Sequence, residues 1–386
     1  NEVALADRTE EVTIKWNFRR DQGAAAVGFE RNTGFVVAQA AVNGKTIDVK
    51  MDIDATSGKF NNKNHTDWCQ VNPGTKFTMP SYKGAVVSLE SMNATTTTTI
   101  EGSTEYTANG GTVSYTVQGT AETVEIVIGD ATWYRSASVV LPAILPENIT
   151  VDVTDGDIVA AVDAAKATVA KVGDITINLK KGTTYTVSKS IEIPAGLVIN
   201  GDSAKIDASA LDAPFIVMSA TPSVELINEY YRVGQVKISN VVVDSIKNSI
   251  FYDNNTKYCV VDFAIDNSVL NLATTAVQNE ALVSFKMGGA KDFNVTNSTI
   301  YGNGVAKYFI RYNNSARLDR YGFDKTTEFQ TMNYQNNTFY NVIQTGGQWG
   351  NYGGIGGQNY SKFDVQKNIW YNSSNEIIRR MAGGRF

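Results

Sequence analysis

The densest set of side chains that could carry out chemistry lies in the segment KYFIRYNNSARLDRYGFDK, residues 307–325. This segment contains Lys307, Arg311, Tyr312 and Arg317. Cations beside phenols can neutralise a carboxylate on a substrate and remove the proton next to it. We therefore expect these four residues to be catalytic if the chain is an enzyme. The alternative is a salt-bridged loop that packs on the fold.

Side chains suited to binding, without chemistry of their own, lie nearby. Arg320 belongs to the same segment, and the glycine-rich stretch TGGQWGNYGGIGGQNY, residues 345–360, carries Trp349 and Tyr352. Aromatic rings present flat apolar faces, and arginine donates paired hydrogen bonds to carboxylates. We expect these three residues to contact a substrate such as a glycan.

Several common reaction classes lack their residues in this chain. Its one histidine, His65, would have to be the base of any Ser-His-Asp or Cys-His enzyme, and we expect it to be an ordinary polar loop residue. Cys69 and Cys259 lie too far apart in sequence to suggest a metal site, and we expect both to be free, buried thiols, with a disulfide as the alternative.

The sequence predicts no cofactor, and calcium stays open as an alternative. The candidate calcium ligands are Asp244, Asp262 and Asp266. The last two are four residues apart, which places them roughly 13 Å apart on an extended strand. They cannot then be neighbouring ligands of one ion.

A short sequence repeat recurs through the second half of the chain. Its five copies are VKISNVVVD, FAIDNSVLN, FNVTNSTIY, MNYQNNTFY and FDVQKNIWY. They align on a common centre, which is Asn240, Asn267, Asn297, Asn336 and Lys367 in turn. Positions four and two before the centre, and three after it, are apolar or aromatic in every copy. Two short strands joined by a bend would produce this pattern.

Repeats of this length indicate a solenoid, and the strand-like period indicates a parallel β-helix. Each coil then stacks like residues on like, and we expect the central Asn residues to form an inward ladder of amides. Four positions after the centre stand Asp244, Asn271, Tyr301, Tyr340 and Tyr371. The three tyrosines would form an outward column that binds sugar rings; the alternative is a structural ladder covered by neighbouring loops.

The front of the chain has a different organisation. Residues 1–145 contain short alternating strands between turns, as in a β-sandwich, and LPAILPENIT marks a boundary. We expect a sandwich over 1–145 that could bind carbohydrate, then a β-helix over 146–386 capped by one short helix near DGDIVAAVDAAKA. We expect each tryptophan of this domain to be buried in the core; the alternative is a sugar site at one edge of the sandwich, formed by Trp16, Trp68, Asn61, Asn62 and Asn64.

The opening AAVDAAKA…GDITINLKKGTTYTVSKSIEIPAGLVINGD resembles the pectate-lyase superfamily of right-handed parallel β-helices, and the likeness covers residues 150–386. The front domain looks like the small β-sandwich that accompanies such β-helices in secreted bacterial glycan-utilisation proteins. Pectinesterase and polygalacturonase signature segments are missing or faint, and no pectate-lyase calcium motif is recognisable. The resemblance therefore implies the fold and a polysaccharide-related role more than any one reaction.

These observations predict an all-β protein that recognises an extracellular polysaccharide, with cleavage of a uronate-containing chain by a lyase mechanism as its enzymatic form. The alternatives are a non-catalytic glycan-binding surface protein and an adhesin or structural solenoid with a protein partner. Residues 286–386 hold 12 Lys and Arg against 6 Asp and Glu, which suits a local anionic partner better than general nucleic-acid binding. The alternative is scattered charge in contact with solvent.

No apolar run approaches the roughly 20 residues of a membrane span. We expect a monomer, either secreted or anchored at the cell surface after removal of a signal.

Overall fold

The computed structural model places the chain in two compact units, Asn1–Leu145 and Pro146–Phe386. Each unit is described by itself. The residues described are 4–18, 33–61, 68–92, 95–107, 111–169, 173–193, 196–218, 231–253, 258–275, 281–285, 289–305, 309–312, 321–324, 327–328, 330–342 and 361–373.

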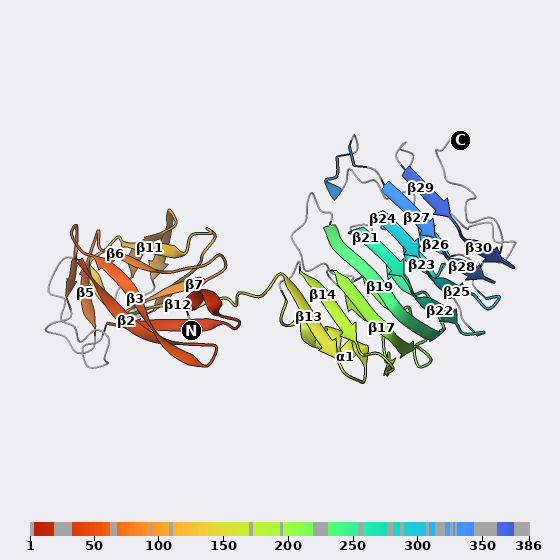
Figure 1. Ribbon diagram of the computed structural model, residues 1–386. Coiled ribbons are helices and arrows are strands. Elements are labelled where there is room, and N and C mark those ends of the chain that lie inside the picture. Colours follow the sequence, from red (N-terminus) through yellow and green to blue (C-terminus); the bar gives the residue numbers. More distant parts are fainter. Residues whose placement is uncertain are drawn as a thin grey trace. The chain divides into compact units, whose positions relative to one another are not determined.

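The first unit is built from two antiparallel sheets (Figure 1). One runs in the order β10 (Thr112–Thr116), β7 (Val86–Ser91), β12 (Thr132–Leu141), β5 (Cys69–Asn72) and β4 (Lys59–Asn61), with β1 (Val12–Asn17) also paired to β12. The other runs β2 (Thr33–Val42), β3 (Lys45–Asp54), β6 (Lys76–Pro80), β11 (Thr123–Ile128), β8 (Thr96–Ile100) and β9 (Ser103–Thr107). A short 3-10 helix, η1 (Leu5–Asp7), precedes β1.

Alternation of apolar and polar residues holds the two sheets of this unit together. Val87 and Leu89 of β7 are buried, whereas the residues between them are partly exposed. Trp16 is fully buried, and its indole N–H donates to the Val49 carbonyl at 3.0 Å. The sugar-binding alternative for Trp16 is therefore wrong, because a satisfied core tryptophan has no surface left to offer.

The second unit opens with a capped helix. In α1 (Ile158–Lys166) the Asp157 carboxylate accepts from the Val159 N–H at 2.9 Å, so Asp157 is the N-cap. The buried face of α1 includes Ile158 and Val162, which pack into the core of the β-helix. No helix in the described part of the chain is long and apolar enough to cross a membrane.

The coils that follow alternate between two parallel sheets (Figure 1). The larger sheet contains β13 (Asn148–Val153), β14 (Asp174–Leu179), β15 (Thr184–Thr186), β17 (Leu197–Asp207), β19 (Tyr231–Ile246), β21 (Tyr258–Asp266), β22 (Val269–Leu272), β24 (Gly289–Thr296), β25 (Thr299–Tyr301), β27 (Gln330–Gln335), β28 (Thr338–Tyr340), β29 (Ser361–Gln366) and β30 (Ile369–Tyr371). The smaller contains β16 (Ile191–Ile193), β18 (Ile216–Met218), β20 (Phe251–Asp253), β23 (Val283–Phe285) and β26 (Ile310–Tyr312). The predicted all-β class, with one helix before a parallel β-helix, is confirmed.

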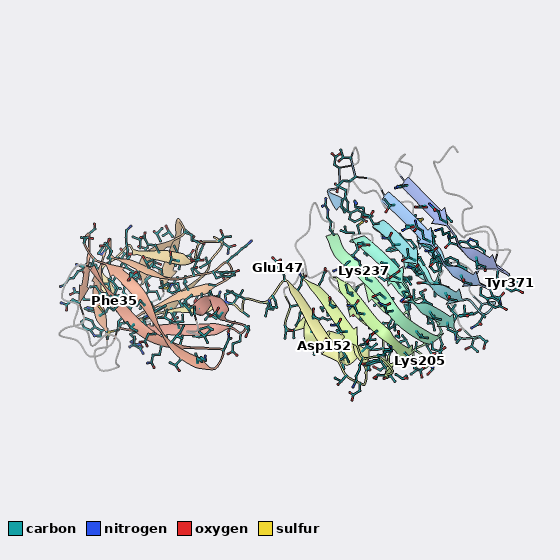
Figure 2. All side chains as sticks on the ribbon, in the orientation of Figure 1. Phe35, Glu147, Asp152, Lys205, Lys237 and Tyr371 are labelled. Atoms are coloured by element: carbon teal, nitrogen blue, oxygen red, sulfur yellow. The ribbon has the colours of Figure 1, made fainter. Side chains whose placement is uncertain are left out.

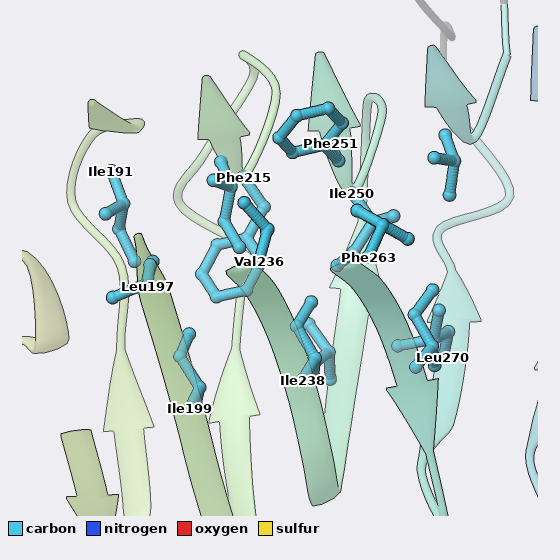
Figure 3. Packing of buried hydrophobic residues seen from close by; sticks show 14 of the residues in the cluster. Ile191, Leu197, Ile199, Phe215, Val236, Ile238, Ile250, Phe251, Phe263 and Leu270 are labelled. Atoms are coloured by element: carbon cyan, nitrogen blue, oxygen red, sulfur yellow. The ribbon is translucent and has the colours of Figure 1, made fainter. Parts of the chain in front are cut away.

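Like residues stack from coil to coil inside the β-helix. Leu197, Val236 and Phe263 pair in register on β17, β19 and β21 (Figure 3). Phe263 in turn stacks on Phe293 with ring centroids 5.1 Å apart and planes within 1°. Twelve of the fifteen apolar positions of the repeat are buried, and Trp370 packs against the core from the last described coil. Val365 is 38% exposed, and the Phe363 side chain lies outside the described part of the chain.

The central residue of each repeat points outward, which corrects the predicted inward ladder. All five centres have φ between 44° and 57°. Their side chains are exposed, and Asn336 Nδ2 donates to Asn297 Oδ1 at 3.2 Å along the outer surface. A residue in the left-handed region turns the chain sharply, and Asn tolerates that conformation better than most residues. The left-handed conformation of the bend therefore explains why Asn occurs at the centre of the repeat, without any need for a buried side-chain amide at that position.

The inward ladder is formed one residue later, by Ser268, Ser298, Asn337 and Asn368. The Ser268 N–H donates to Ser298 Oγ at 3.1 Å, and the Ser298 N–H donates to Asn337 Oδ1 at 2.9 Å. The Asn337 N–H donates to Asn368 Oδ1 at 3.0 Å. Each side chain thus satisfies the buried backbone of the coil before it.

We expect Asn337→Ala to lower the free energy of unfolding of the β-helix by about 2–4 kcal/mol. The variant leaves the Ser298 N–H and the Val295 carbonyl without their bonds to Asn337. Urea unfolding followed by circular dichroism measures the change.

The matched control for that variant is Asn336→Gly, one residue earlier. Glycine adopts the φ of 57° without strain, and the amide it removes is on the outside. We expect a loss under about 1 kcal/mol. Equal losses from the two variants would contradict the assignment of the inward ladder.

Candidate functional site

The predicted catalytic residues lie on and around the last described strand of the smaller sheet. Arg311 and Tyr312 belong to β26, where they pair with Ser284 and Phe285 of β23. The side chains of these two residues, and all of Lys307, Arg317 and Arg320, lie outside the described part of the chain. Trp349 and Tyr352 lie outside it as well. Their roles stay predictions.

The described end of the 307–325 segment is packed on the outside of the larger sheet. Tyr321 and Phe323 are buried against Cys259 and Val261. Arg232 lies over the Phe323 ring at 3.9 Å and donates from Nε to the Tyr321 carbonyl at 2.5 Å. Burial raises the pKa of the Cys259 thiol, so this thiol is a packing residue with little thiolate. This end of the segment therefore packs on β19 and β21, as expected for a loop with a structural role.

The three predicted tyrosines do form one outward column. Tyr301 of β25, Tyr340 of β28 and Tyr371 of β30 are paired in register on successive coils. They are 40%, 36% and 59% exposed, respectively. Figure 2 shows Tyr371 projecting from β30. All three rings are in contact with solvent in the described part of the chain, which does not include residues 343–360 or 374–386.

The rings of the column are not arranged alike. Tyr340 and Tyr371 are stacked, with centroids 5.0 Å apart and planes within 5°. Tyr301 and Tyr340 are 5.9 Å apart and tilted by 57°. A parallel stack turns one face of each ring toward its neighbour, so the free area of this pair is the ring edges and the outer face of Tyr371. The tilt at Tyr301 leaves its ring less covered by Tyr340.

Close contact between coils holds the column in place. The Gly302 N–H, directly after Tyr301, donates to the Tyr340 carbonyl at 2.8 Å. A Cβ on Gly302 would overlap the Asn341 carbonyl oxygen, so only glycine permits this approach. The Asn341 N–H donates to the Tyr371 carbonyl at 3.1 Å, and the side chains of Asn341 and Asn372 are hydrogen-bonded to each other. The tyrosine backbones are therefore rigidly spaced, one per coil.

The same column is polar in the preceding coils. Asn271 Nδ2 donates to Asp244 Oδ1 at 2.8 Å, and Asn303, two residues after Tyr301 on the same coil, donates from Nδ2 to Asn271 Oδ1 at 3.0 Å. Lys205 Nζ lies 2.8 Å from the Asp244 carboxylate. The hydrogen bond from Lys205 lowers the pKa of Asp244, assisted by the Asn271 amide and opposed by partial burial. An aromatic surface thus continues into amide and carboxylate groups on one line.

A second polar surface precedes the bend, and the sequence analysis missed it. Outward positions five residues before the centre carry Asp262 and Asp292 on adjacent coils. Lys237 Nζ lies 2.6 Å from Asp262, and Lys291 Nζ lies 3.1 Å from Asp292. The aligned repeats contain this column and could have revealed it. Each of these two carboxylates therefore has a lysine as its ion-pair partner.

The calcium candidates all have other partners. Asp244 binds Lys205, Asp262 binds Lys237, and Asp266 accepts from Thr296 and Asn297. Among the described residues, no group of three or more His, Cys, Asp and Glu side chains could hold a metal ion. Calcium at these aspartates stays a prediction from the sequence.

Comparisons with known proteins identify no family. No family model matches the chain, and no curated protein matches it. The resemblance to the pectate-lyase superfamily therefore stays a prediction.

Two solved structures are weakly similar. One is described by the words "the complexity of the Ruminococcus flavefaciens cellulosome reflects an expansion in glycan recognition"; it is 15% identical, covering 34% of this chain and 96% of its own, with a TM-score of 0.21. The other is the catalytic unit of a thermostable GH87 alpha-1,3-glucanase from Streptomyces thermodiastaticus; it is 11% identical, covering 79% and 68%, with a TM-score of 0.26. Both TM-scores are too low to support an assignment of the site, so that assignment depends on the geometry of the site itself.

We expect Asp244→Asn to lower the melting temperature at neutral pH and to lose its effect in acid. A carboxyl whose pKa is lowered by folding stabilises the folded state above its unfolded pKa, about 3.9. That stabilisation is lost as the pH falls through the lower folded pKa. Thermal melts of both proteins from pH 7 to pH 2 measure the difference.

The control for this pH series is Asp212→Asn, since the Asp212 side chain is 86% exposed in its pair with Lys247. We expect a small change at every pH, because exposed ion pairs contribute little. A melting difference for Asp244→Asn that stays constant down to pH 2 would show that the Lys205–Asp244 pair is not its cause.

Proposed function

We propose that the β-helix of this chain binds an extracellular polysaccharide at the column formed by Tyr301, Tyr340 and Tyr371. The observation that supports the proposal is the set of three exposed aromatic rings in register on a rigid parallel sheet. Large aromatic side chains in contact with water are costly unless a ligand covers them, and three in one line are more than scattered surface residues.

The chemistry of the column suits sugars. Ring faces and edges supply apolar contact to the C–H groups of a pyranose, and the phenolic hydroxyls supply hydrogen bonds. Asn303 and Asn271 continue the line with amide groups that can donate to and accept from sugar hydroxyls. Tyr371, the most exposed of the three rings, is the place where a sugar can cover a whole ring face.

The shape of the column favours a polymer over a small molecule. Successive coils of a parallel sheet are about 4.8 Å apart, so the three rings extend roughly 10 Å along the solenoid axis. A ligand that contacts all three rings must be extended in the same direction. Chain polysaccharides have that form.

We further propose that the polysaccharide contains uronate residues. Lys362 and Lys367 are exposed on the last described coil, close in sequence to Tyr371. Their ammonium groups are suited to pair with uronate carboxylates. Cleavage by a lyase depends on Lys307, Arg311, Tyr312 and Arg317, whose side chains lie outside the described part of the chain. The proposal therefore concerns binding, and lyase activity remains the sequence-based prediction.

We expect the double variant Tyr340→Ala/Tyr371→Ala to bind its polysaccharide about five- to thirtyfold more weakly than the natural chain, because it removes roughly 1–2 kcal/mol of aromatic contact. Affinity electrophoresis on polygalacturonate, alginate, xylan and β-glucan identifies the polymer, and calorimetry gives the affinity. The same mixtures, followed by ultraviolet absorbance from unsaturated uronate ends, report cleavage.

The matched control is Tyr82→Ala in the first unit, since Tyr82 is 41% exposed but lies outside the column. We expect its affinity to be unchanged. Equal affinities of the natural chain and the double variant would refute the tyrosine site. Failure of the natural chain to bind any polymer of the panel would instead favour the adhesin alternative, with a protein partner.

A further inference from the structure

A second aromatic surface lies on the first unit. Trp68, directly before β5, and Trp133 of β12 are both partly exposed. Their ring centroids are 4.8 Å apart, and their planes are inclined by 43°. Tryptophan contributes the largest aromatic area of any side chain, and its usual place in a sandwich is the core, as for Trp16. Two adjacent tryptophans on the surface are therefore unusual.

Strand alternation places both indoles on the outer face of their sheet. In β12 the neighbours Thr132 and Tyr134 are buried, so Trp133 between them points away from the core. In β5 the buried residues are Cys69 and Val71, which places Trp68 and Gln70 on the opposite side. Register brings the two strands together, because Trp133 pairs with Gln70.

Polar groups beside the indoles can bind hydroxyls. Lys59 Nζ donates to Gln70 Oε1 at 3.0 Å, and Asn61 pairs with Gln70 in the β4–β5 ladder. Two other cations in the described part of this sheet share one carboxylate, since Glu90 lies 3.8 Å from Arg135 and 3.5 Å from Lys15. Among the described residues, the hydrogen-bond partner of Lys59 is a neutral amide, so its ammonium can donate to a ligand as well.

We propose that Trp68 and Trp133, with Gln70 and Lys59, form a second carbohydrate-binding site on the sandwich. Two rings inclined by 43° cannot fully cover each other, so aromatic area remains for a pyranose, unlike the parallel pair of Tyr340 and Tyr371. The Gln70 amide and the Lys59 ammonium then bond the hydroxyls or carboxylates at the rim of the sugar. A purely apolar partner would take the Lys59 ammonium out of water without adding an opposite charge or a new hydrogen bond, which is costly.

This site goes beyond the tyrosine column and does not depend on it. The two sites lie in separate compact units, each with its own core. A chain with two sugar sites binds a long polymer more tightly than either site alone when the polymer can reach both. The variants of one site can therefore be tested in a chain whose other site has been removed.

The experiment uses the full chain carrying Tyr340→Ala/Tyr371→Ala as the background, titrated with polygalacturonate, alginate, xylan and β-glucan. Binding is read by intrinsic tryptophan fluorescence and by calorimetry. In this background we expect residual binding of at least one polymer, with a change in tryptophan emission. Addition of Trp133→Ala or Trp68→Ala is expected to weaken that binding at least tenfold, and Gln70→Ala about threefold.

The control is Phe35→Ala, which removes another exposed aromatic ring of the same unit. Phe35 is 43% exposed on β2, and Lys50 Nζ lies 4.5 Å from its ring centroid, so it too combines an aromatic with a lysine. We expect unchanged affinity. Gln70→Ala tests the site without removing an indole, in case a tryptophan variant fails to fold.

Two results would overturn the second site. One is unchanged affinity when Trp133 and Gln70 are replaced. The other is the loss of all binding to the panel in the background variant, which would assign every contact to the tyrosine column. Failure of the tyrosine column itself is recognised separately, since the background variant would then bind as tightly as the natural chain.

Discussion

The hydrogen bond from each coil's backbone to a buried side chain of the next coil is the interaction on which the rest of the β-helix depends. Ser298, Asn337 and Asn368 make these bonds directly after the outward bend. Without them the backbone at each bend would be buried and unpaired, at a cost of about 1–3 kcal/mol per group. They also fix the register, since a slip of one residue would move every apolar side chain to the wrong face.

Register has a functional consequence as well as a structural one. Once Met332 is held over Phe293 inside the β-helix, Tyr340 must stand over Tyr301 outside it. The glycine at position 302 lets the two coils approach, and the asparagines beside the tyrosines bond from coil to coil. The aromatic column is thus a direct product of the stacking, and its preorganisation reduces the entropy lost when a ligand binds.

The sequence predicted the features that local periodicity controls. The inward apolar positions and the tyrosine column can both be inferred from spacing along the chain. The bend was located correctly, but its orientation was wrong: the left-handed φ of Asn297 directs that side chain outward and the next residue inward. A pattern of apolar and polar residues does not reveal the backbone conformation of a single residue.

Contacts between distant segments were harder to infer. Trp133 meets Trp68 only because β12 pairs with β5 in an antiparallel sandwich, and nothing local in either segment predicts that pairing. Hydroxyl-radical footprinting, read by mass spectrometry on the polysaccharide-bound chain, tests the central claim most directly. The account predicts that oxidation of Tyr301, Tyr340 and Tyr371 slows together while Tyr82 reacts at its original rate. Unchanged oxidation of all three tyrosines under saturating polysaccharide would contradict it.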